Sequence, residues 1–290
     1  IKMTLVVSII MNIFHVGSNY VLIFGMGAIP ALGVLGVSIS TNLSKFLGLV
    51  ILLVLFFRYL KIDLSWRYLK PFPWDSAKKI LSIAVPSGAE TLSYQLSQTF
   101  IMKIVNVFGL IVINTKIYVY IMAMFCYSYA LAISAAMQIV MGYLIGEKNF
   151  GQVSTTVWKA VGIATLITGL ITTTLYFNSD IVFRIFTDNE EILKLGQQIF
   201  FIEIFLEIGR AVNIVMVRAL QAAGDIKTPV TVGIGGMWFI AVFGAYILGI
   251  VLNFGLVGVW IAMALDEIIR ALIFIYRWQS GRWQQKILIN

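Results

Sequence analysis

Eight apolar runs separated by polar links fill most of this chain and constrain its fold more than any other feature. Each run is about 20 to 30 residues long, the length of helix that crosses a hydrocarbon layer about 30 Å thick. Backbone polar groups find no partner in lipid, so a crossing segment is a helix or a barrel strand, and runs this long exclude strands. The sequence therefore predicts an all-α integral membrane protein with eight transmembrane helices. The predicted spans are residues 4–24, 32–57, 78–107, 111–143, 156–177, 192–221, 229–252 and 255–276.

Composition agrees with a membrane protein. Hydrophobic residues make up 60% of the chain and charged residues 12%, about half the charged fraction of a soluble domain. The chain has one cysteine, Cys126, and one histidine, His15, so neither a disulfide framework nor a cysteine metal site is predicted. We interpret His15 as a packing or interfacial residue rather than a ligand.

The net charge of +8 is concentrated in alternate links, after the second, fourth, sixth and eighth spans. Cytoplasmic links of membrane proteins carry an excess of lysine and arginine. This alternation predicts a multi-pass protein of the cell membrane with both ends of the chain in the cytoplasm, rather than a nucleic-acid-binding protein. The basic residues concerned are Arg58, Lys61, Arg67, Lys70, Lys78, Lys79, Lys148, Lys227, Arg277, Arg282 and Lys286.

A pair of glycines recurs at two spans that lie six helices apart. Gly33 and Gly36 accompany the start of the second span, and Gly255 and Gly258 open the eighth, 222 residues later. The recurrence favours parallel repeats of six helices, four of which lie outside this chain. Small-residue pairs are common wherever membrane helices approach closely, so the match by itself leaves a chance recurrence open.

Four stretches of the chain resemble the multidrug and toxic compound extrusion (MATE) transporters. Asn12–Gly25 and Pro30–Thr41 look like the fifth and sixth helices of that family. Met141–Gly151 resembles the glycine-rich exit from its eighth helix, and Arg218–Pro229 resembles the link between its helices ten and eleven. The resemblance implies helices five to twelve of a twelve-helix fold that consists of two six-helix lobes.

This resemblance also implies a domain organisation. Residues 1–57 are assigned to the last two helices of the N-terminal lobe, and residues 58–77 to the cytoplasmic linker between the lobes. Residues 78–290 form a six-helix C-terminal lobe with a short cytoplasmic tail. The missing N-terminal helices are then partners of this chain.

The resemblance implies a secondary active antiporter. Such a protein exports organic cations or other amphipathic compounds, such as drugs, toxins and metabolites, in exchange for protons or sodium ions. Its partners are the lipid bilayer, a small-molecule substrate and a coupling cation, with no further cofactor. The sequence has no G-x-x-x-x-G-K-[ST] phosphate loop, which agrees with an ion gradient rather than ATP as the energy source.

Two alternative functions stay open. A flippase of lipid-linked saccharides has a similar architecture, but its anionic substrate demands a strongly basic cavity, and the spans offer mainly Arg210. The other alternative is a membrane-embedded enzyme. The sequence has no H-E-x-x-H, no G-x-S-x-G and no clustered aspartate metal motif, so no catalytic residue and no metal site are predicted.

A carboxylate, Glu90, lies inside the third span, and Tyr94 and Gln98 follow one and two turns later on the same helical face. An ionised group at the bilayer centre is costly and normally faces a bundle interior or a water-filled cavity. These three side chains are therefore candidate ion-coupling and substrate residues, with hydrogen bonding between helices as the alternative role. The resembled transporters carry a functional glutamate one turn further from Pro86, where this sequence has Tyr94, and this departure bears on the role of Glu90.

The sixth span carries a second polar face: Glu203, Glu207, Arg210 and Asn213 follow one another at spacings of four, three and three residues. Glu207 and Arg210 form a predicted pair within the helix, which either contributes to the cavity or only neutralises itself. Sodium-coupled relatives have an aspartate where this sequence has Arg210. The resemblance therefore implies proton coupling, or a different ion site, in this chain.

The eighth span contains a further charge cluster. Arg270 follows Asp266 by four residues and Glu267 by three, so either carboxylate can pair with it. Because these residues lie past the middle of the span, toward its cytoplasmic end, we interpret them as a structural cluster that locks the inner part of the lobe.

Overall fold

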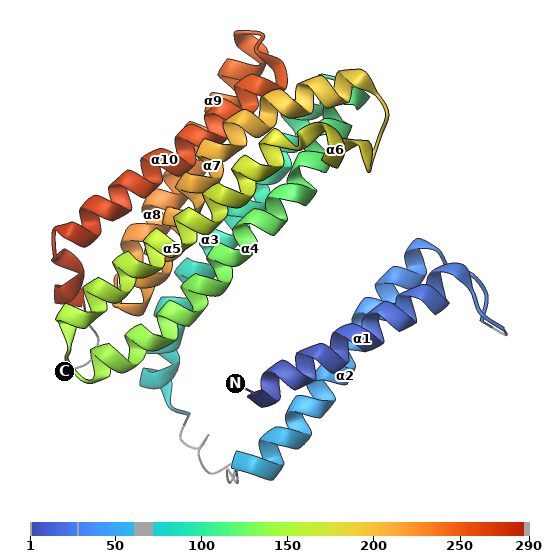
Figure 1. The fold of residues 1–290 in the computed structure, drawn as a ribbon. Coiled ribbons are helices and arrows are strands. Elements are labelled where there is room, and N and C mark those ends of the chain that lie inside the picture. Colours follow the sequence, from blue (N-terminus) through green and yellow to red (C-terminus); the bar gives the residue numbers. More distant parts are fainter. Residues whose placement is uncertain (1, 28, 61–71, 287–290) are drawn as a thin grey trace. The chain divides into compact units, whose positions relative to one another are not determined.

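The computed structural model describes residues 2–27, 29–60 and 72–286. The chain divides into two compact units, Ile1–Asp75 and Ser76–Asn290, and both are helical (Figure 1). In the described residues, eight long helical segments coincide with the eight apolar runs, and their ends differ from the predicted ones by a few residues. The predicted all-α fold is confirmed.

The smaller unit is a hairpin of two long helices, α1 (Lys2–Phe24) and α2 (Val34–Leu60). The interface between them is polar. His15 Nε2 lies 3.2 Å from Thr41 Oγ1, and the hydroxyl oxygens of Ser18 and Ser40 are 2.5 Å apart. In lipid, hydrogen bonds and close packing hold helices together, because no hydrophobic effect acts between them. His15 is thus an interfacial residue, as predicted.

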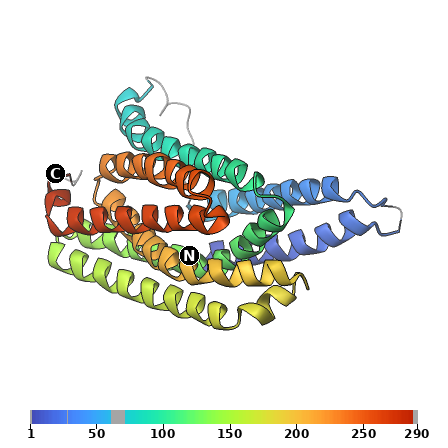
Figure 2. The same ribbon diagram turned by 90° about the horizontal axis from the view of Figure 1, so that it is seen from above.

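The larger unit consists of α3 (Trp74–Asn106), α4 (Leu110–Gly146), α5 (Phe150–Phe177), α6 (Ser179–Arg184), α7 (Glu190–Ala222), α8 (Lys227–Gly235), η2 (Gly236–Val242), α9 (Phe243–Ala245), η3 (Tyr246–Val251), α10 (Gly255–Gln279) and η4 (Arg282–Lys286). α7 lies at its centre and packs against α4, α5 and α10 (Figure 2). The segment from α8 to η3 is one helical rod in which η2 and η3 are π-helical.

Two helices of the larger unit begin earlier than hydrophobicity alone indicates, because an asparagine caps each of them. The side chain of Asn149 accepts a hydrogen bond from the Gln152 backbone N–H, 3.3 Å away, and starts α5. Asn189 accepts from the backbone N–H of Glu191 at 2.9 Å and starts α7. Such caps satisfy N–H groups that have no partner inside the helix.

The described residues include both ends of the predicted linker, residues 58–77. α2 continues to Leu60 and α3 starts at Trp74, so helices occupy both ends of that range. Residues 61–71, and with them Lys61, Arg67 and Lys70, lie outside the described residues. The assignment of this stretch to a cytoplasmic connection stays a prediction.

The recurring glycine pair has the same local conformation in both units. Gly33 (φ 53°) and Gly255 (φ 56°) are in the left-handed region, which favours glycine. At Gly36 and Gly258, a Cβ atom would collide with the backbone of the preceding helical segment. The two pairs therefore agree in conformation as well as in sequence, and this favours the internal repeat.

Two apolar clusters fill the two ends of the larger unit. One contains Met141, Val215 and Phe274, and the other contains Phe200 and Val259, among other residues. Between the clusters, α7 and α10 carry charged side chains instead of apolar ones. These buried charged residues are Glu203, Glu207, Asp266, Glu267 and Arg270, together with the partly buried Arg210.

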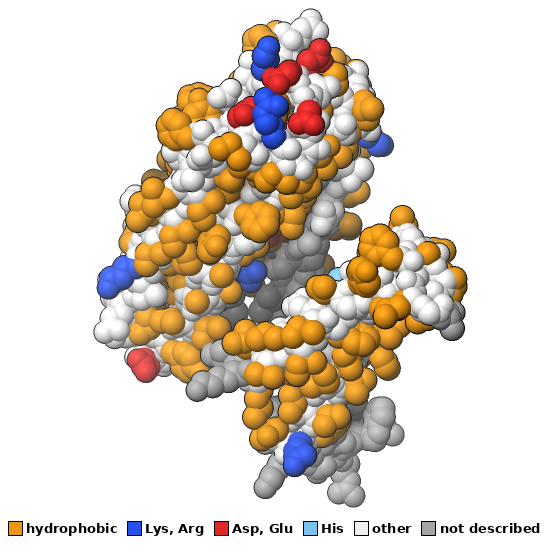
Figure 3. Space-filling view, turned by 45° about the vertical axis from the view of Figure 1, so that its right-hand side comes forward, with side chains coloured by type: hydrophobic (Ala, Val, Ile, Leu, Met, Phe, Trp, Pro, Cys, Tyr) orange, Lys and Arg blue, Asp and Glu red, His pale blue; other side chains and the backbone are white. Residues whose placement is uncertain are grey.

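Within the described ranges, five helical segments are long and apolar enough to cross a membrane: Met3–Phe24, Val34–Tyr59, Leu110–Gly146, Phe150–Phe177 and Lys227–Val251. The other three long helices, α3, α7 and α10, carry more polar and charged side chains, which lowers their hydropathy. On the face seen in Figure 3, hydrophobic side chains cover the length of the larger unit, and acidic and basic side chains gather at one end. This distribution is typical of an integral membrane protein.

Candidate functional site

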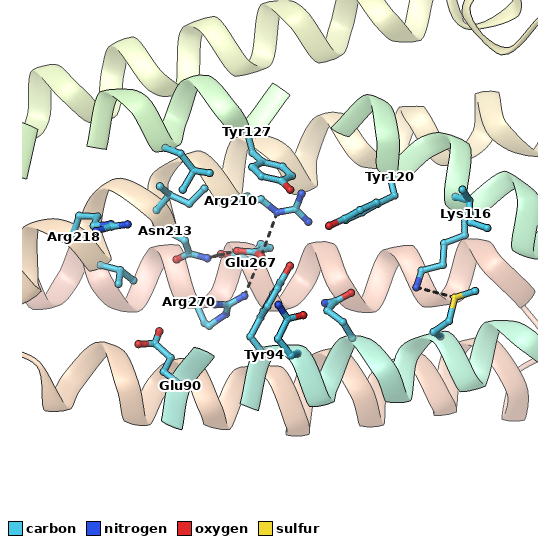
Figure 4. A pocket seen from close by; sticks show the side chains of 17 residues that line it. Glu90, Tyr94, Lys116, Tyr120, Tyr127, Arg210, Asn213, Arg218, Glu267 and Arg270 are labelled. Carbon is cyan, nitrogen blue, oxygen red and sulfur yellow. Dashed lines mark hydrogen bonds and ion pairs between the residues drawn. The ribbon is translucent and has the colours of Figure 1, made fainter. Parts of the chain in front are cut away.

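A cavity of about 610 Å³ lies in the larger unit between α3, α4, α7 and α10 (Figure 4). Figure 4 shows Arg218 toward one end of it and Lys116 at the other. Along α3 it extends from Glu90 to Met102, which corresponds to about 18 Å of helix. The lining residues are Glu90, Tyr94, Gln95, Gln98, Met102, Lys116, Ile117, Tyr120, Tyr127, Leu131, Arg210, Asn213, Ile214, Val217, Arg218, Glu267 and Arg270.

The three candidate residues of α3, namely Glu90, Tyr94 and Gln98, all line this cavity. α3 enters the apolar core through Ile101 and Val105 in its last turns, and both of these side chains are fully buried. The polar stripe in the middle of α3 faces the cavity between the helices. The structure thus places the stripe as expected, and its part in ion coupling stays a prediction.

Arg210 on α7 joins three glutamates. It contacts Glu207, its predicted partner within the helix, and its guanidinium nitrogens lie 3.6 Å from Glu267 Oε1 and 4.0 Å from Glu203 Oε1. Arg210 lines the cavity, whereas Glu207 is fully buried and is not among the lining residues. The Glu207 Oε2 atom has no hydrogen-bond partner among the described residues. Glu207 therefore does not face the cavity itself but contacts Arg210, which does.

Asn213, the third candidate on α7, is held by α10. Its amide donates hydrogen bonds to the backbone carbonyl of Glu267 at 2.8 Å and to the carboxylate at 2.5 Å. Glu267 also lies 3.1 Å from the Arg270 guanidinium, which in turn donates two hydrogen bonds to Asp266 at 2.9 and 2.6 Å. Glu267 therefore bridges the two arginines.

The cluster of Asp266, Glu267 and Arg270 also belongs to the cavity, which its sequence spacing did not indicate. The ion pairs between these residues form as their spacing indicated. Glu267 and Arg270, however, line the cavity and contact the polar face of α7, so the cluster is not a separate lock. The spacing of residues within α10 does not show which helix they face, so their contact with α7 could not be predicted from the sequence.

Carboxyl groups outnumber guanidinium groups in this network. Glu203, Glu207, Asp266 and Glu267 are buried beside only two arginines, which leaves an excess of two negative charges when all four carboxyl groups are ionised. An uncompensated charge inside a membrane protein is costly. The network can therefore be neutral only if it takes up protons or a cation.

Glu90 stands apart from this network. Its side chain is half-buried, its main electrostatic neighbour is Arg270, and it forms no hydrogen bond or ion pair with any described residue. A Cβ atom on Gly233 of α8 would lie only 3.2 Å from Glu90 Oε1, so the absence of a side chain there leaves room for the carboxylate. Glu90 is thus a carboxylate that faces the cavity and is free to bind a ligand.

Several lining residues were not found from the sequence. α4 contributes Lys116 and Tyr120 to this set. Tyr127 of the same helix also lines the cavity, and its ring lies 5.4 Å from the Arg210 guanidinium carbon. The expectation that the cavity offers mainly Arg210 as a basic group is wrong, because Lys116, Arg218 and Arg270 also line it. A lysine inside an apolar run was the available signal for Lys116.

The π-helical segment η2 allows close contact with the charge cluster. A Cβ atom on Gly236 would lie 2.8 Å from Arg270 Cδ and would also collide with the Asp266 carboxylate. Helices with π-helical turns often occur at functional sites. In this unit the segment brings a glycine backbone against the ion pair of Asp266 and Arg270.

The sequence pattern of the MatE family matches residues 86–247, more than half of the chain. YisQ, an uncharacterized transporter of Bacillus subtilis (strain 168), is 35% identical over 289 residues, which cover 98% of this chain and 63% of YisQ. NorM, a probable multidrug resistance protein of Thermotoga maritima, is 23% identical over 293 residues, which cover 99% of this chain and 61% of NorM.

Solved structures agree with these relatives. The Vibrio cholerae MATE transporter VcmN has a TM-score of 0.82 at 16% identity, covering 95% of this chain and 61% of VcmN. The chain therefore belongs to the MatE family and has part of a MATE fold, as its sequence indicated. It spans 61 to 63% of the length of these relatives.

Proposed function

We propose that this chain is part of a secondary active antiporter that exports organic cations or other amphipathic compounds in exchange for protons or sodium ions. The observation that carries the proposal is the position of Glu90, a carboxylate without an ion-pair partner among the described residues, at a cavity of about 610 Å³ inside a membrane bundle. Ligand sites for drug-sized molecules have volumes of this order. Membership of a transporter family points to transport rather than to catalysis.

Competition between substrate and ion for Glu90 couples their movements. The ionised carboxylate attracts a cationic group, and a proton or sodium ion bound to the same carboxylate cancels that attraction. Substrate and ion then exclude each other, so alternating access by two lobes moves them in opposite directions. Tyr94, Tyr120 and Tyr127 offer aromatic surfaces to substrates of varied shape.

The surroundings of Arg210 favour protons over sodium ions. The guanidinium already lies among the carboxylates of Glu207, Glu203 and Glu267. The resemblance to the family implies an aspartate at this position in sodium-coupled members, where this chain has Arg210. A proton can neutralise a carboxylate in this network without the space and the oxygen ligands that a second cation needs.

The arrangement of the whole transporter is part of the proposal. Residues 1–57 are the end of the N-terminal lobe, residues 78–290 are the C-terminal lobe, and residues 58–77 connect them in the cytoplasm. Both ends of the chain are cytoplasmic, and the protein lies in the cell membrane. The remaining N-terminal helices complete the first lobe.

Efflux of a cationic dye tests the role of Glu90. The transporter that contains this chain is reconstituted in proteoliposomes, and ethidium efflux is driven by a proton or a sodium gradient. Glu90→Gln is expected to lower gradient-driven efflux at least about tenfold, because an amide cannot bind the ion by charge. The melting temperature should stay close to that of the wild type, because Glu90 forms no ion pair with the described residues. Glu147→Gln removes an exposed carboxylate after α4 and should leave efflux unchanged.

Two results would contradict this role. Efflux by Glu90→Gln at the normal ratio of ions to substrate would show that coupling occurs elsewhere. A loss of efflux together with a large drop in melting temperature would make Glu90 a structural residue.

The basic lining also favours a second candidate, a flippase of lipid-linked saccharides. Four basic side chains line the cavity, against the two carboxylates of Glu90 and Glu267. Two results together would support this candidate over the antiporter. Proteoliposomes without an ion gradient would translocate a fluorescent polyprenyl-diphosphate saccharide across their membrane, and proteoliposomes with an ion gradient would show no ethidium efflux.

A further inference from the structure

Lys116 lines the cavity, and no acidic side chain in the described part of the chain pairs with it. It lies on α4, six residues after the helix begins, and its side chain is half-buried. Its ammonium group donates a hydrogen bond to the Met102 sulfur at 3.5 Å and forms no ion pair with any described residue. In Figure 4 the ammonium of Lys116 points toward α3 at the end of the cavity away from Glu90.

A thioether cannot satisfy this group. An ammonium has three N–H donors, and a methionine sulfur is a weak acceptor of one of them. A buried cation in a membrane protein normally pairs with a carboxylate or a backbone carbonyl, and one without such a partner marks a functional site by default. Lys116 therefore has unused hydrogen-bonding capacity that faces a cavity.

The other basic side chains of the cavity differ from Lys116. Arg210 and Arg270 have carboxylate partners within 4.0 Å, and Arg218 is exposed and donates to the Gln138 side-chain oxygen at 3.2 Å. An added anion at Arg210 or Arg270 would compete with these internal partners. At Lys116 it would meet a cation that no described carboxylate neutralises.

The neighbours of Lys116 suit the rest of an amphipathic molecule. Ile117 and Tyr120 on α4 give apolar and aromatic surface, and Gln95 and Gln98 on α3 give amide donors. The carboxylate of Glu90 lies at the opposite end, about 18 Å away along α3 from the level of Met102. An anion at Lys116 is therefore not in contact with Glu90.

We propose that the end of the cavity at Lys116 binds the anionic group of an amphipathic compound, a carboxylate, sulfonate or phosphate, with its apolar part against Ile117 and Tyr120. The inference rests on the proposed function, because it extends the substrates of the same cavity from cations to amphipathic anions. Anionic lipid head groups share this chemistry with free organic anions.

Binding of two dansyl probes tests the proposal without any ion gradient, so its outcome is separate from that of the transport assay. The transporter is placed in phosphatidylcholine nanodiscs, and binding is followed by tryptophan-to-dansyl energy transfer, corrected with empty nanodiscs. Dansylglycine carries a carboxylate, and dansylamide carries the same ring without charge. The wild type is expected to bind dansylglycine at least about tenfold more tightly than dansylamide, since one charge-assisted hydrogen bond changes a binding constant by about that factor. Equal affinities would overturn the proposal without any mutant.

Three variants localise the effect. Lys116→Gln should weaken dansylglycine binding about tenfold and leave dansylamide binding unchanged, while Lys116→Arg should retain the binding of dansylglycine. Lys103→Gln is the matched control, because Lys103 is an exposed lysine of α3 that does not line the cavity. An equal loss in Lys103→Gln, or an equal loss of both probes in Lys116→Gln, would overturn the proposal.

A lipid competition separates the two sources of the anion. Phosphatidylglycerol added to the nanodiscs should displace dansylglycine from the wild type and from Lys116→Arg if lipid head groups occupy the site. Tight dansylglycine binding that phosphatidylglycerol does not displace identifies a free organic anion as the occupant. Both results support an anion site at Lys116.

Discussion

At the level of single residues, Arg210 contacts three of the five buried carboxylates in the described part of the chain. It lies among Glu203, Glu207 and Glu267, and the last two of these carboxylates belong to different helices. Removing one partner of a buried ion pair leaves an uncompensated charge, which is far more costly than the loss of an exposed pair. The guanidinium is therefore expected to stabilise the fold as well as to shape the cavity.

Replacement of Arg210 by an apolar residue should destabilise the fold. Arg210→Leu is expected to lower the free energy of unfolding by about 3–5 kcal/mol, because three buried carboxylates lose their shared cation. The control is Arg184→Leu, which removes an exposed arginine paired with Asp180 and Glu190 and should have little effect. Thermal unfolding of both variants of the transporter in detergent is the measurement. Similar small shifts would mean that the carboxylates around Arg210 carry protons and do not require it.

At the scale of helical elements, the rod from α8 to η3 is the part least expected from hydrophobic pattern. The sequence predicts one apolar span at 229–252, and the structure has two π-helical stretches within it, η2 and η3. The first of them packs against α10. Its glycine, Gly236, touches the ion pair of Asp266 and Arg270, so the shape of this rod and the position of Arg270 at the cavity depend on each other.

Two neighbouring glycines test this dependence. Gly236→Ala is expected to displace the pair of Asp266 and Arg270 and to cost about 1–3 kcal/mol of the free energy of unfolding, as overpacking usually does. Gly235→Ala is the control, because nothing lies within 4 Å of a Cβ atom at that position. It should be neutral or slightly stabilising, since alanine favours a helix more than glycine does. Equal melting temperatures for the two variants would show that η2 tolerates a side chain against Arg270.

At the scale of the whole molecule, the chain spans only 61 to 63% of its relatives. Its larger unit contains a cavity with its own charged network, and its smaller unit is a hairpin of α1 and α2. Alternating access requires two lobes that move against each other. The described residues supply one six-helix unit and two further long helices.

Reconstitution of the isolated chain tests whether transport needs a second complete lobe. The 290-residue chain in proteoliposomes is expected to show no gradient-driven ethidium efflux, because it spans only 61 to 63% of the length of its transporter relatives. The longer transporter in the same vesicles is the positive control. Dansylglycine binding to the isolated chain should persist, since the cavity lies within residues 90–270. Efflux by the isolated chain would contradict the need for a second complete lobe.

The fold class, the eight helices and the candidate faces of α3 and α7 could all be predicted from the sequence. These features depend on hydrophobic run length and on helical spacing, which are local properties of the chain. Glu90, Tyr94, Gln98, Arg210 and Asn213 were predicted together for this reason, and the structure places all five at one cavity.

Which helices face one another is seen only in the folded structure. Glu267 meets Arg210 and Asn213 across more than 50 residues of sequence, and Lys116 meets Met102 across a helical hairpin. Spacing within a helix cannot reveal such contacts, because they depend on the rotation and approach of neighbouring helices. The same reason explains why Glu207, on the predicted face of α7, is buried behind Arg210 rather than exposed to the cavity.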